Sequence, residues 1–185
     1  MENDNRHLYV ALIRGIMPTN PNMRNEKLRL VLEDLGFSGI KTVIASGNLI
    51  FQTDSSDIKK LEDLFEKVLS EKLSFNSTTI IQSQKDLQTM IEADPFKQYE
   101  RTQTMRLNVT FLKEEPEFNS EFPYQVENTS YTLLGMNNRA IFSVIDISAD
   151  KTPDMMSWLE KQFGKEITTR SWNTIQRIFN KTRTA

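Results

Sequence analysis

The sequence predicts an α+β protein in which a ferredoxin-like βαββαβ half packs with a second, smaller α+β half. Residues 8–13 form an apolar run that would bury both faces of a strand, so this strand should be central in a sheet. Two amphipathic helical patterns and three further β-rich segments follow it in the order of the ferredoxin-like unit. The pattern becomes less regular after residue 82. We therefore expect a ferredoxin-like domain over residues 1–82 and an α+β domain with a helical C-terminus over residues 83–185.

The elements of the first half follow from apolar spacing and from turn residues. A first helix is predicted to end at Gly36, and a second should be capped within residues 55–57. Ser46-Gly47-Asn48 separates two β-rich runs and predicts a hairpin turn. The expected strands are 8–13, 40–45, 49–53 and 78–82, and the apolar helix positions are Leu28, Val31, Leu32 and Leu35, then Ile58, Leu61, Leu64, Phe65, Val68 and Leu69.

The second half mixes strands, helices and one long polar segment. Residues 83–86 have the composition of a capping box that opens a short helix, and this helix should end before Pro95. Residues 113–127 are polar and acidic and are expected to form a surface loop. The remaining predictions are a strand over 105–112, a hairpin over 131–134 and 140–147 with its turn at 135–138, a helix that starts at 152–154 and ends at Gly164, and a last helix from about Ser171.

The composition limits the class of protein. Of the 185 residues, 38% are apolar and 26% are charged, which is typical of a soluble globular protein. The chain has no cysteine, which excludes disulfides, thiolate nucleophiles and cysteine metal sites and favours a cytoplasmic location. The polar start lacks the apolar core of a signal peptide, and no apolar run approaches the ~20 residues of a membrane helix. We therefore expect no membrane association.

The charge is unevenly distributed along the chain. The net charge of -2 argues against a general nucleic-acid coat, although a local basic patch is compatible with it. The region from residue 165 onward is rich in cations: Lys165, Arg170, Arg177, Lys181 and Arg183, with Glu166 as the acid among them. These cations either form a basic patch or lie on a solvated helix face near a helix C-terminus, which is the simpler interpretation.

Arg14 follows the apolar run at the end of the predicted central strand, and Gly15 comes next. In the ferredoxin-like topology this strand end meets three other features at one edge of the sheet. They are the start of the first helix near Asn22, the hairpin at Ser46-Gly47-Asn48, and the entry to the fourth strand at 76–77. A guanidinium, short polar side chains, open backbone and a helix N-terminus can together bind a phosphate or carboxylate. We predict a ligand site with Arg14, Gly15, Ser46, Gly47 and Asn48.

Each of these residues also has a structural interpretation. Arg14 can pair with an acid or bind the carbonyl groups of a strand end. Ser46-Gly47-Asn48 can serve as a turn and nothing more. The region of Asn22 can act only as a helix cap. The predicted convergence of the residues, rather than any one of them, favours a ligand site.

A second polar cluster precedes the last predicted helix. Trp172 falls on the buried face of that helix, and Ser171 or Thr169 should be its cap. Arg170 and Asn173 have two interpretations. Either they face the first site across the domain interface and complete a shared cleft, or Arg170 joins the two domains as a structural strut.

The sequence lacks the residues that several kinds of catalytic and metal-binding site require. His7 is the only histidine and lies near the N-terminus, so we expect no histidine-based triad. The sequence contains no metal-ligand spacing and no glycine-rich phosphate motif, so we expect neither a metal nor a cofactor. The acidic run at 114–117 should be a solvated face. Asp146 and Asp150 flank a strand end, and nothing in the sequence pairs them.

Six short motifs follow one another along the chain. They are Leu12-Ile13-Arg14-Gly15-Ile16, Leu35-Gly36-Phe37, Ser46-Gly47-Asn48-Leu49-Ile50-Phe51, Asp94-Pro95-Phe96, Val109-Thr110-Phe111-Leu112 and Thr168-Thr169-Arg170-Ser171-Trp172-Asn173-Thr174. With these motifs the chain resembles, over almost its whole length, the bacterial proteins grouped as domain of unknown function 1697. The resemblance implies an α+β protein with a ferredoxin-like first half, and it implies no activity because the family has no assigned one.

The chain departs from the pattern of that family in two places. Its Asn-Val-Gly-Gly after the first strand is Met17-Pro18-Thr19-Asn20 in this chain, which removes a flexible backbone cradle for an anion. Ser171 replaces an asparagine, which is a milder change.

The sequence is compatible with three functions. We favour a binding module for a phosphate-bearing ligand, a nucleotide or a nucleic-acid end, at the sheet edge that carries Arg14 and Ser46-Gly47-Asn48. One alternative is an enzyme that uses arginine electrostatics without histidine or cysteine. The other is a structural or oligomerising protein without a small-molecule ligand, which predicts an exposed apolar patch.

Overall fold

The computed structural model describes residues 6–45, 47–100, 102–148 and 154–184. The chain forms two compact units, Met1–Thr89 with Gln176–Ala185, and Met90–Ile175. The units differ from the predicted split into 1–82 and 83–185, because the last residues belong to the first unit. The divisions fall inside α3 (Gln84–Ala93) and α5 (Trp172–Thr182), so a helix forms each link between the units.

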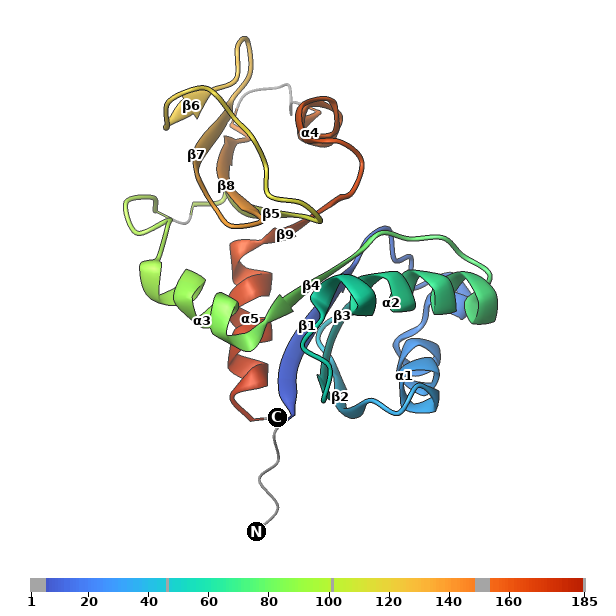
Figure 1. The fold of residues 1–185 in the computed structure, drawn as a ribbon. Coiled ribbons are helices and arrows are strands. Elements are labelled where there is room, and N and C mark those ends of the chain that lie inside the picture. The colour runs from blue at the N-terminus through green and yellow to red at the C-terminus, as the bar shows by residue number, and fades with distance from the viewer. Residues whose placement is uncertain (1–5, 46, 101, 149–153, 185) are drawn as a thin grey trace. The chain divides into compact units, whose positions relative to one another are not determined.

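The first unit contains a four-stranded antiparallel sheet (Figure 1). The strand order is β2-β3-β1-β4, which places the apolar first strand inside the sheet as predicted. The elements follow the expected βαββαβ order along the chain, with one added 3₁₀ turn. They are β1 (His7–Ile13), η1 (Pro21–Met23), α1 (Asn25–Asp34), β2 (Ser38–Thr42), β3 (Asn48–Thr53), α2 (Ile58–Leu73) and β4 (Thr79–Ser83).

The core of this unit lies between the sheet and the helices α1 and α2. Alternate residues of β1 point to this core, and the ring of Phe51 of β3 makes tilted contacts with the rings of Phe37 at 5.0 Å and Phe65 at 5.1 Å. Val10 and Leu12 point to the other face of the sheet and are also buried. The part of α5 from Gln176 onward lies on that side (Figure 1). Both faces of β1 are therefore covered, as its continuous apolar run predicts.

The first helix starts later than predicted. Asn20 Oδ1 accepts a hydrogen bond of 3.0 Å from the N–H of Asn22, which caps the short turn η1. Pro21 opens that turn, and α1 begins only at Asn25. The cap predicted near Asn22 therefore belongs to a single 3₁₀ turn, because a proline at the first position favours a helical turn of any kind.

The edge strand β4 is covered by carboxylates of α2. Glu66 Oε1 accepts a hydrogen bond of 2.8 Å from the N–H of Thr79, and Glu62 Oε1 accepts one of 2.8 Å from the N–H of Ile81. Glu62 is only 3% exposed. The two acids are four residues apart and lie on one face of α2. They satisfy edge N–H groups that would otherwise be available to pair with another strand.

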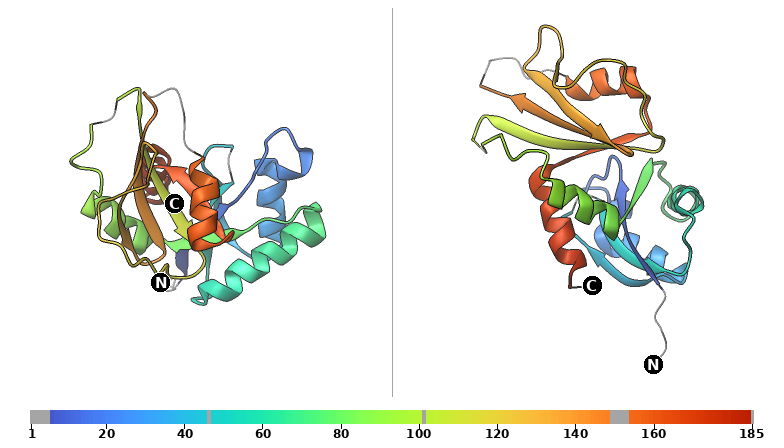
Figure 2. Two further views of the ribbon diagram at one scale, coloured as in Figure 1. Left: turned by 90° about the horizontal axis from the view of Figure 1, so that it is seen from above. Right: turned by 60° about the vertical axis from the view of Figure 1, so that its left-hand side comes forward.

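The second unit contains a five-stranded antiparallel sheet with the order β6-β7-β8-β5-β9 (Figure 2). A hydrophobic core that includes Leu159 of α4 covers one face, and on the other face the ring of Phe96 contacts the rings of Phe142 and Trp172. Asp154 caps α4 by accepting from the N–H of Ser157, while residues 152–153 of the predicted helix start lie outside the described residues. The elements are β5 (Met105–Leu112), β6 (Tyr124–Gln125), β7 (Tyr131–Asn137), β8 (Ala140–Asp146), α4 (Met155–Phe163) and β9 (Ile167–Ser171).

Two sequence predictions for this unit were wrong in part. The surface loop at 113–127 contains β6, and Phe118, Phe122 and Tyr124 pack against the core. The sequence prediction also missed the edge strand β9, which directly precedes the last helix. Its hydroxyl residues resemble a cap in sequence, but Thr169 Oγ1 lies 2.8 Å from Thr110 Oγ1 of β5.

The last helix begins as expected at its cap. Ser171 Oγ accepts a hydrogen bond of 3.3 Å from the N–H of Thr174, and Trp172 is 2% exposed. The predicted roles of these two residues as cap and core are confirmed.

Every helix in the described part of the chain is too short or too polar to span a lipid bilayer.

Candidate functional site

The end of β1 and the loop between β2 and β3 lie together at one edge of the first sheet. The N–H of Ile13 donates a hydrogen bond of 2.8 Å to the carbonyl of Gly47. Arg14 extends the contact to the entry of β4, since its N–H donates to Thr78 O at 2.9 Å and its carbonyl accepts from Ser77 Oγ at 2.6 Å. The main chain of Arg14 is thus fixed on both sides. The predicted convergence of these segments is present.

The start of α1 reaches the same loop. Asn25 Nδ2 donates a hydrogen bond of 3.3 Å to the carbonyl of Ile44. Ile44 has a φ of 61°, a left-handed conformation that a β-branched residue rarely adopts. We call the feature formed by Arg14, Gly15, Gly47, Asn48 and residues 76–78 the Arg14 edge.

The two glycines of the Arg14 edge have different roles. Gly47 has a φ of 72°, and a Cβ there would lie 2.8 Å from the carbonyl oxygen of Ile13 and 2.5 Å from Cγ1 of Ile16. A side chain is therefore excluded by the close approach of the loop to β1, not by a ligand. Gly15 has a φ of 68°, and a Cβ there would meet no atom within 4 Å. Of these two glycines, Gly15 is the one whose backbone is accessible to a ligand.

Asn48 is buried and stabilises the loop between β2 and β3. Its side chain is 1% exposed, and Nδ2 donates a hydrogen bond of 3.0 Å to the carbonyl of Val43. The N–H of Val43 donates in return to Asn48 O at 2.9 Å. Asn48 therefore shapes the turn, and any effect on a ligand would be indirect. Ser46, the third predicted residue of this turn, lies outside the described residues.

A hollow of about 350 Å³ adjoins the main chain of Arg14 and is lined by Glu66, Asn76, Ser77 and Thr78. Glu66 places a carboxylate in this hollow, and its Oε1 is held by the N–H of Thr79. A bare anion would be repelled by this group, whereas a hydroxyl could donate to it. The edge therefore combines one guanidinium, one carboxylate and several neutral polar groups.

Arg170 and Asn173 lie in the second unit. Arg170, on β9, donates from Nη1 to Thr168 Oγ1 at 2.7 Å and to the carbonyl of Thr169 at 3.0 Å. Burial lowers the pKa of its guanidinium to about 10, so it remains a cation at neutral pH. Asn173 is the exposed second residue of α5. Because these residues and Arg14 belong to different units, their joining in one cleft stays a prediction.

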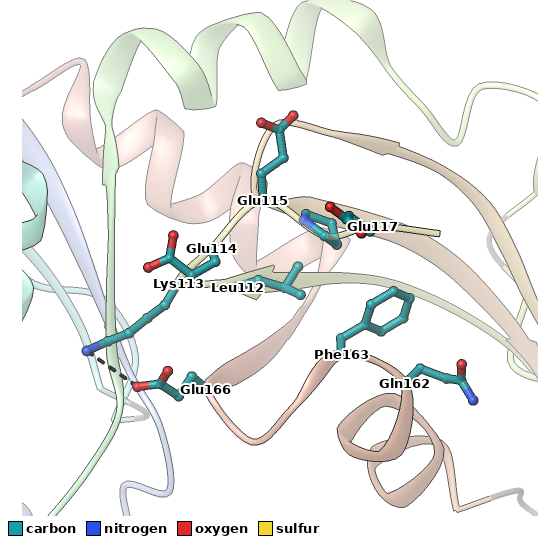
Figure 3. A pocket seen from close by; sticks show the side chains of 9 residues that line it. Leu112, Lys113, Glu114, Glu115, Glu117, Gln162, Phe163 and Glu166 are labelled. Atoms are coloured by element: carbon teal, nitrogen blue, oxygen red, sulfur yellow. Dashed lines mark ion pairs between the residues drawn. The ribbon is translucent and has the colours of Figure 1, made fainter. Parts of the chain in front are cut away.

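The acidic run at 114–117 lines a hollow of about 260 Å³ in the second unit. In Figure 3 the carboxylates of Glu115 and Glu166 point in different directions. Glu166 Oε1 forms an ion pair with Lys113 Nζ at 3.8 Å. Among the residues that the structure describes, no group of three acids or histidines is placed to hold a metal ion. The hollow fits the expected solvated face.

Sequence reasoning missed one hollow of the first unit. It lies between the end of β2 and the last turns of α5 and is lined in part by Arg177 and Lys181. The basic tail was visible in the sequence, but the loop that faces it lies more than a hundred residues earlier.

The structure defines an α+β protein with two antiparallel sheets and a polar edge built around one arginine. The family model for a protein of unknown function, DUF1697, matches residues 7–142, and the chain belongs to this family. The predicted membership of this family is thereby confirmed. No curated protein is similar enough in sequence to count as a match.

A solved structure, that of the conserved bacterial protein SP0830 from Streptococcus pneumoniae, is similar to this chain with a TM-score of 0.69. The two chains share 20% sequence identity, and the alignment covers 96% of this chain and 99% of SP0830. At this identity the similarity extends to the fold alone.

Proposed function

We propose that the protein is a binding module that holds a phosphate-bearing ligand, a nucleotide or a nucleic-acid end, at the Arg14 edge. The observation that carries the proposal is the convergence of Arg14, the open backbone at Gly15 and the polar hollow at 76–78 on one edge of the first sheet. A guanidinium is planar and can bind two phosphate oxygens at once.

The carboxylate of Glu66 narrows the class of ligand. It lines the hollow beside the Arg14 main chain and can accept a hydrogen bond from a hydroxyl. Because the Glu66 carboxylate is negatively charged, it repels inorganic phosphate. A phosphate ester that carries sugar hydroxyls suits both groups, so a nucleotide should bind more tightly than phosphate alone.

A thermal-shift experiment tests the proposal. Wild-type protein is heated with adenosine 5′-monophosphate, inorganic phosphate or a short oligonucleotide, and the experiment is repeated with Arg14→Gln. A ligand at one hundred times its dissociation constant should stabilise the wild type by about 2.7 kcal/mol. This stabilisation should be smaller in Arg14→Gln than in the wild type, and it should be unchanged in the control Arg29→Gln, which alters an exposed arginine paired with Glu33 on α1. Equal stabilisation of wild type and Arg14→Gln, or none of the wild type with any probe, would overturn the proposal.

A further inference from the structure

A second hollow, of about 430 Å³, lies in the first unit between the end of β2 and the C-terminal turns of α5. Its cationic side is formed by Arg177 and Lys181 of α5. Its other side is formed by Val43 and Ile44 of the loop after β2. We call it the Arg177 groove. Its size falls within the range of small-molecule sites, roughly 300–1,000 Å³.

The two cations share one face of α5. They are four residues apart, so their side chains emerge one helical turn from each other. No carboxylate of a described residue lines the groove, and neither side chain makes a hydrogen bond or ion pair with another described residue. Two like charges at this spacing repel each other unless an anion lies between them.

The end of α5 does not need these cations to satisfy its carbonyl groups. Thr182 Oγ1 donates to the carbonyl of Phe179 at 2.7 Å, and Thr184 Oγ1 donates to the carbonyl of Lys181 at 3.1 Å. The ammonium group of Lys41 donates to the carbonyl of Thr184. The helix dipole favours a cation here, but it does not require the guanidinium of Arg177 to line a hollow.

The opposite side of the groove is apolar and conformationally unusual. Ile44 is 40% exposed, one of three large apolar side chains that are exposed among the described residues. The backbone of Ile44 is in a left-handed conformation, which is unfavourable for a β-branched residue. The groove therefore offers two cations on one side and an exposed aliphatic side chain on the other, with the neutral polar groups of Thr42 and Asn180 beside them.

We propose that the Arg177 groove binds an organic monophosphate. Arg177 and Lys181 hold the phosphoryl group, and the uncharged body of the ligand packs against Val43 and Ile44. The groove does not include Arg14, so this site does not rest on the function proposed above.

Adenosine 5′-monophosphate is a suitable probe, with inorganic phosphate and adenosine as its two halves. Titrated into ¹⁵N-labelled protein at about 0.15 M salt, the monophosphate should shift the amide resonances of Thr42, Val43 and Ile44 and those of α5 after Arg177. Its dissociation constant should rise at least tenfold in Arg177→Gln and in Lys181→Gln. Glutamine has a helix propensity similar to that of arginine and lysine, so both variants should fold.

The matched control is Arg183→Gln, which removes a cation two positions from Lys181 that does not line the groove. Ile44→Asn, which suits a left-handed conformation, should weaken the monophosphate and leave inorganic phosphate unchanged. Arg14→Gln should not alter the shifts at residues 42–44, whereas shifts at Gly15 and Ser77 report the Arg14 edge. The proposal fails if the groove amides do not shift, or if Arg183→Gln weakens binding as much as Arg177→Gln, which would indicate non-specific charge attraction.

Discussion

Replacement of Gly47 by alanine tests the contact on which the Arg14 edge depends. A left-handed conformation costs an alanine about 1–2 kcal/mol. Alanine also lowers the conformational entropy of the unfolded chain relative to glycine, which offsets about 0.4–1 kcal/mol of this cost. At Gly47 the new Cβ would also lie 2.5 Å from Ile16 Cγ1 and 2.8 Å from Ile13 O. Overpacking against such neighbours adds about 1–3 kcal/mol. We expect Gly47→Ala to lower the free energy of unfolding by about 2–4 kcal/mol.

Gly15→Ala is the matched control for this change. Its φ of 68° is nearly that of Gly47, but its Cβ would meet no atom within 4 Å. The backbone cost alone remains, about 1 kcal/mol. Urea unfolding followed by far-ultraviolet circular dichroism measures both variants. If Gly47→Ala is no more destabilising than Gly15→Ala, the loop does not approach β1 as described and the Arg14 edge does not exist in this form.

Three further predictions concern stability and protonation. Glu62→Leu should cost about 2 kcal/mol in urea unfolding because the N–H of Ile81 loses its buried acceptor, and it should promote self-association in gel filtration, whereas Glu62→Gln should retain most of the stability. Ser157→Ala should raise the pKa of Asp154 in an NMR titration, because hydrogen bonds from Ser157 hold that pKa below its usual value. The lowered pKa of Asp154 stabilises the folded protein at pH values above the pKa that this group has in the unfolded chain, and this stabilisation is lost as the pH falls through the pKa of the folded state. The variant should therefore lose less stability than the wild type below about pH 4. Trp172→Ala should cost about 3–5 kcal/mol in the same urea assay, and a loss below 1 kcal/mol would contradict the core position of this ring.

Local signals in the sequence predicted most of the regular elements. The predicted helix cap at Ser83 was correct, since the N–H of Asp86 donates to Ser83 Oγ at 3.0 Å. The continuous apolar run of β1 correctly indicated a strand buried on both faces. These features depend on residues close together in the chain, so periodicity and turn chemistry were sufficient.

Features that depend on distant residues could not be predicted in the same way. The amphipathic pattern of α5 shows that one face is buried but not which sheet covers it, so the return of residues 176–185 to the first unit was missed. The turn residues Gly47 and Asn48 were expected to meet a ligand, but their constraints come from Ile13, Ile16 and Val43. Contacts of this kind become visible only in three dimensions.

The interrupted sequence of the first unit has a consequence for synthesis on the ribosome. Residues 90–175 are contiguous and can complete their contacts as soon as they emerge. Most of the first unit is translated earlier, but it lacks Ile178, which is fully buried in the folded protein, until the second unit has been translated. The usual order in which the N-terminal part folds first should therefore be reversed. A nascent chain stalled before residue 176 would expose one face of the first sheet to chaperones.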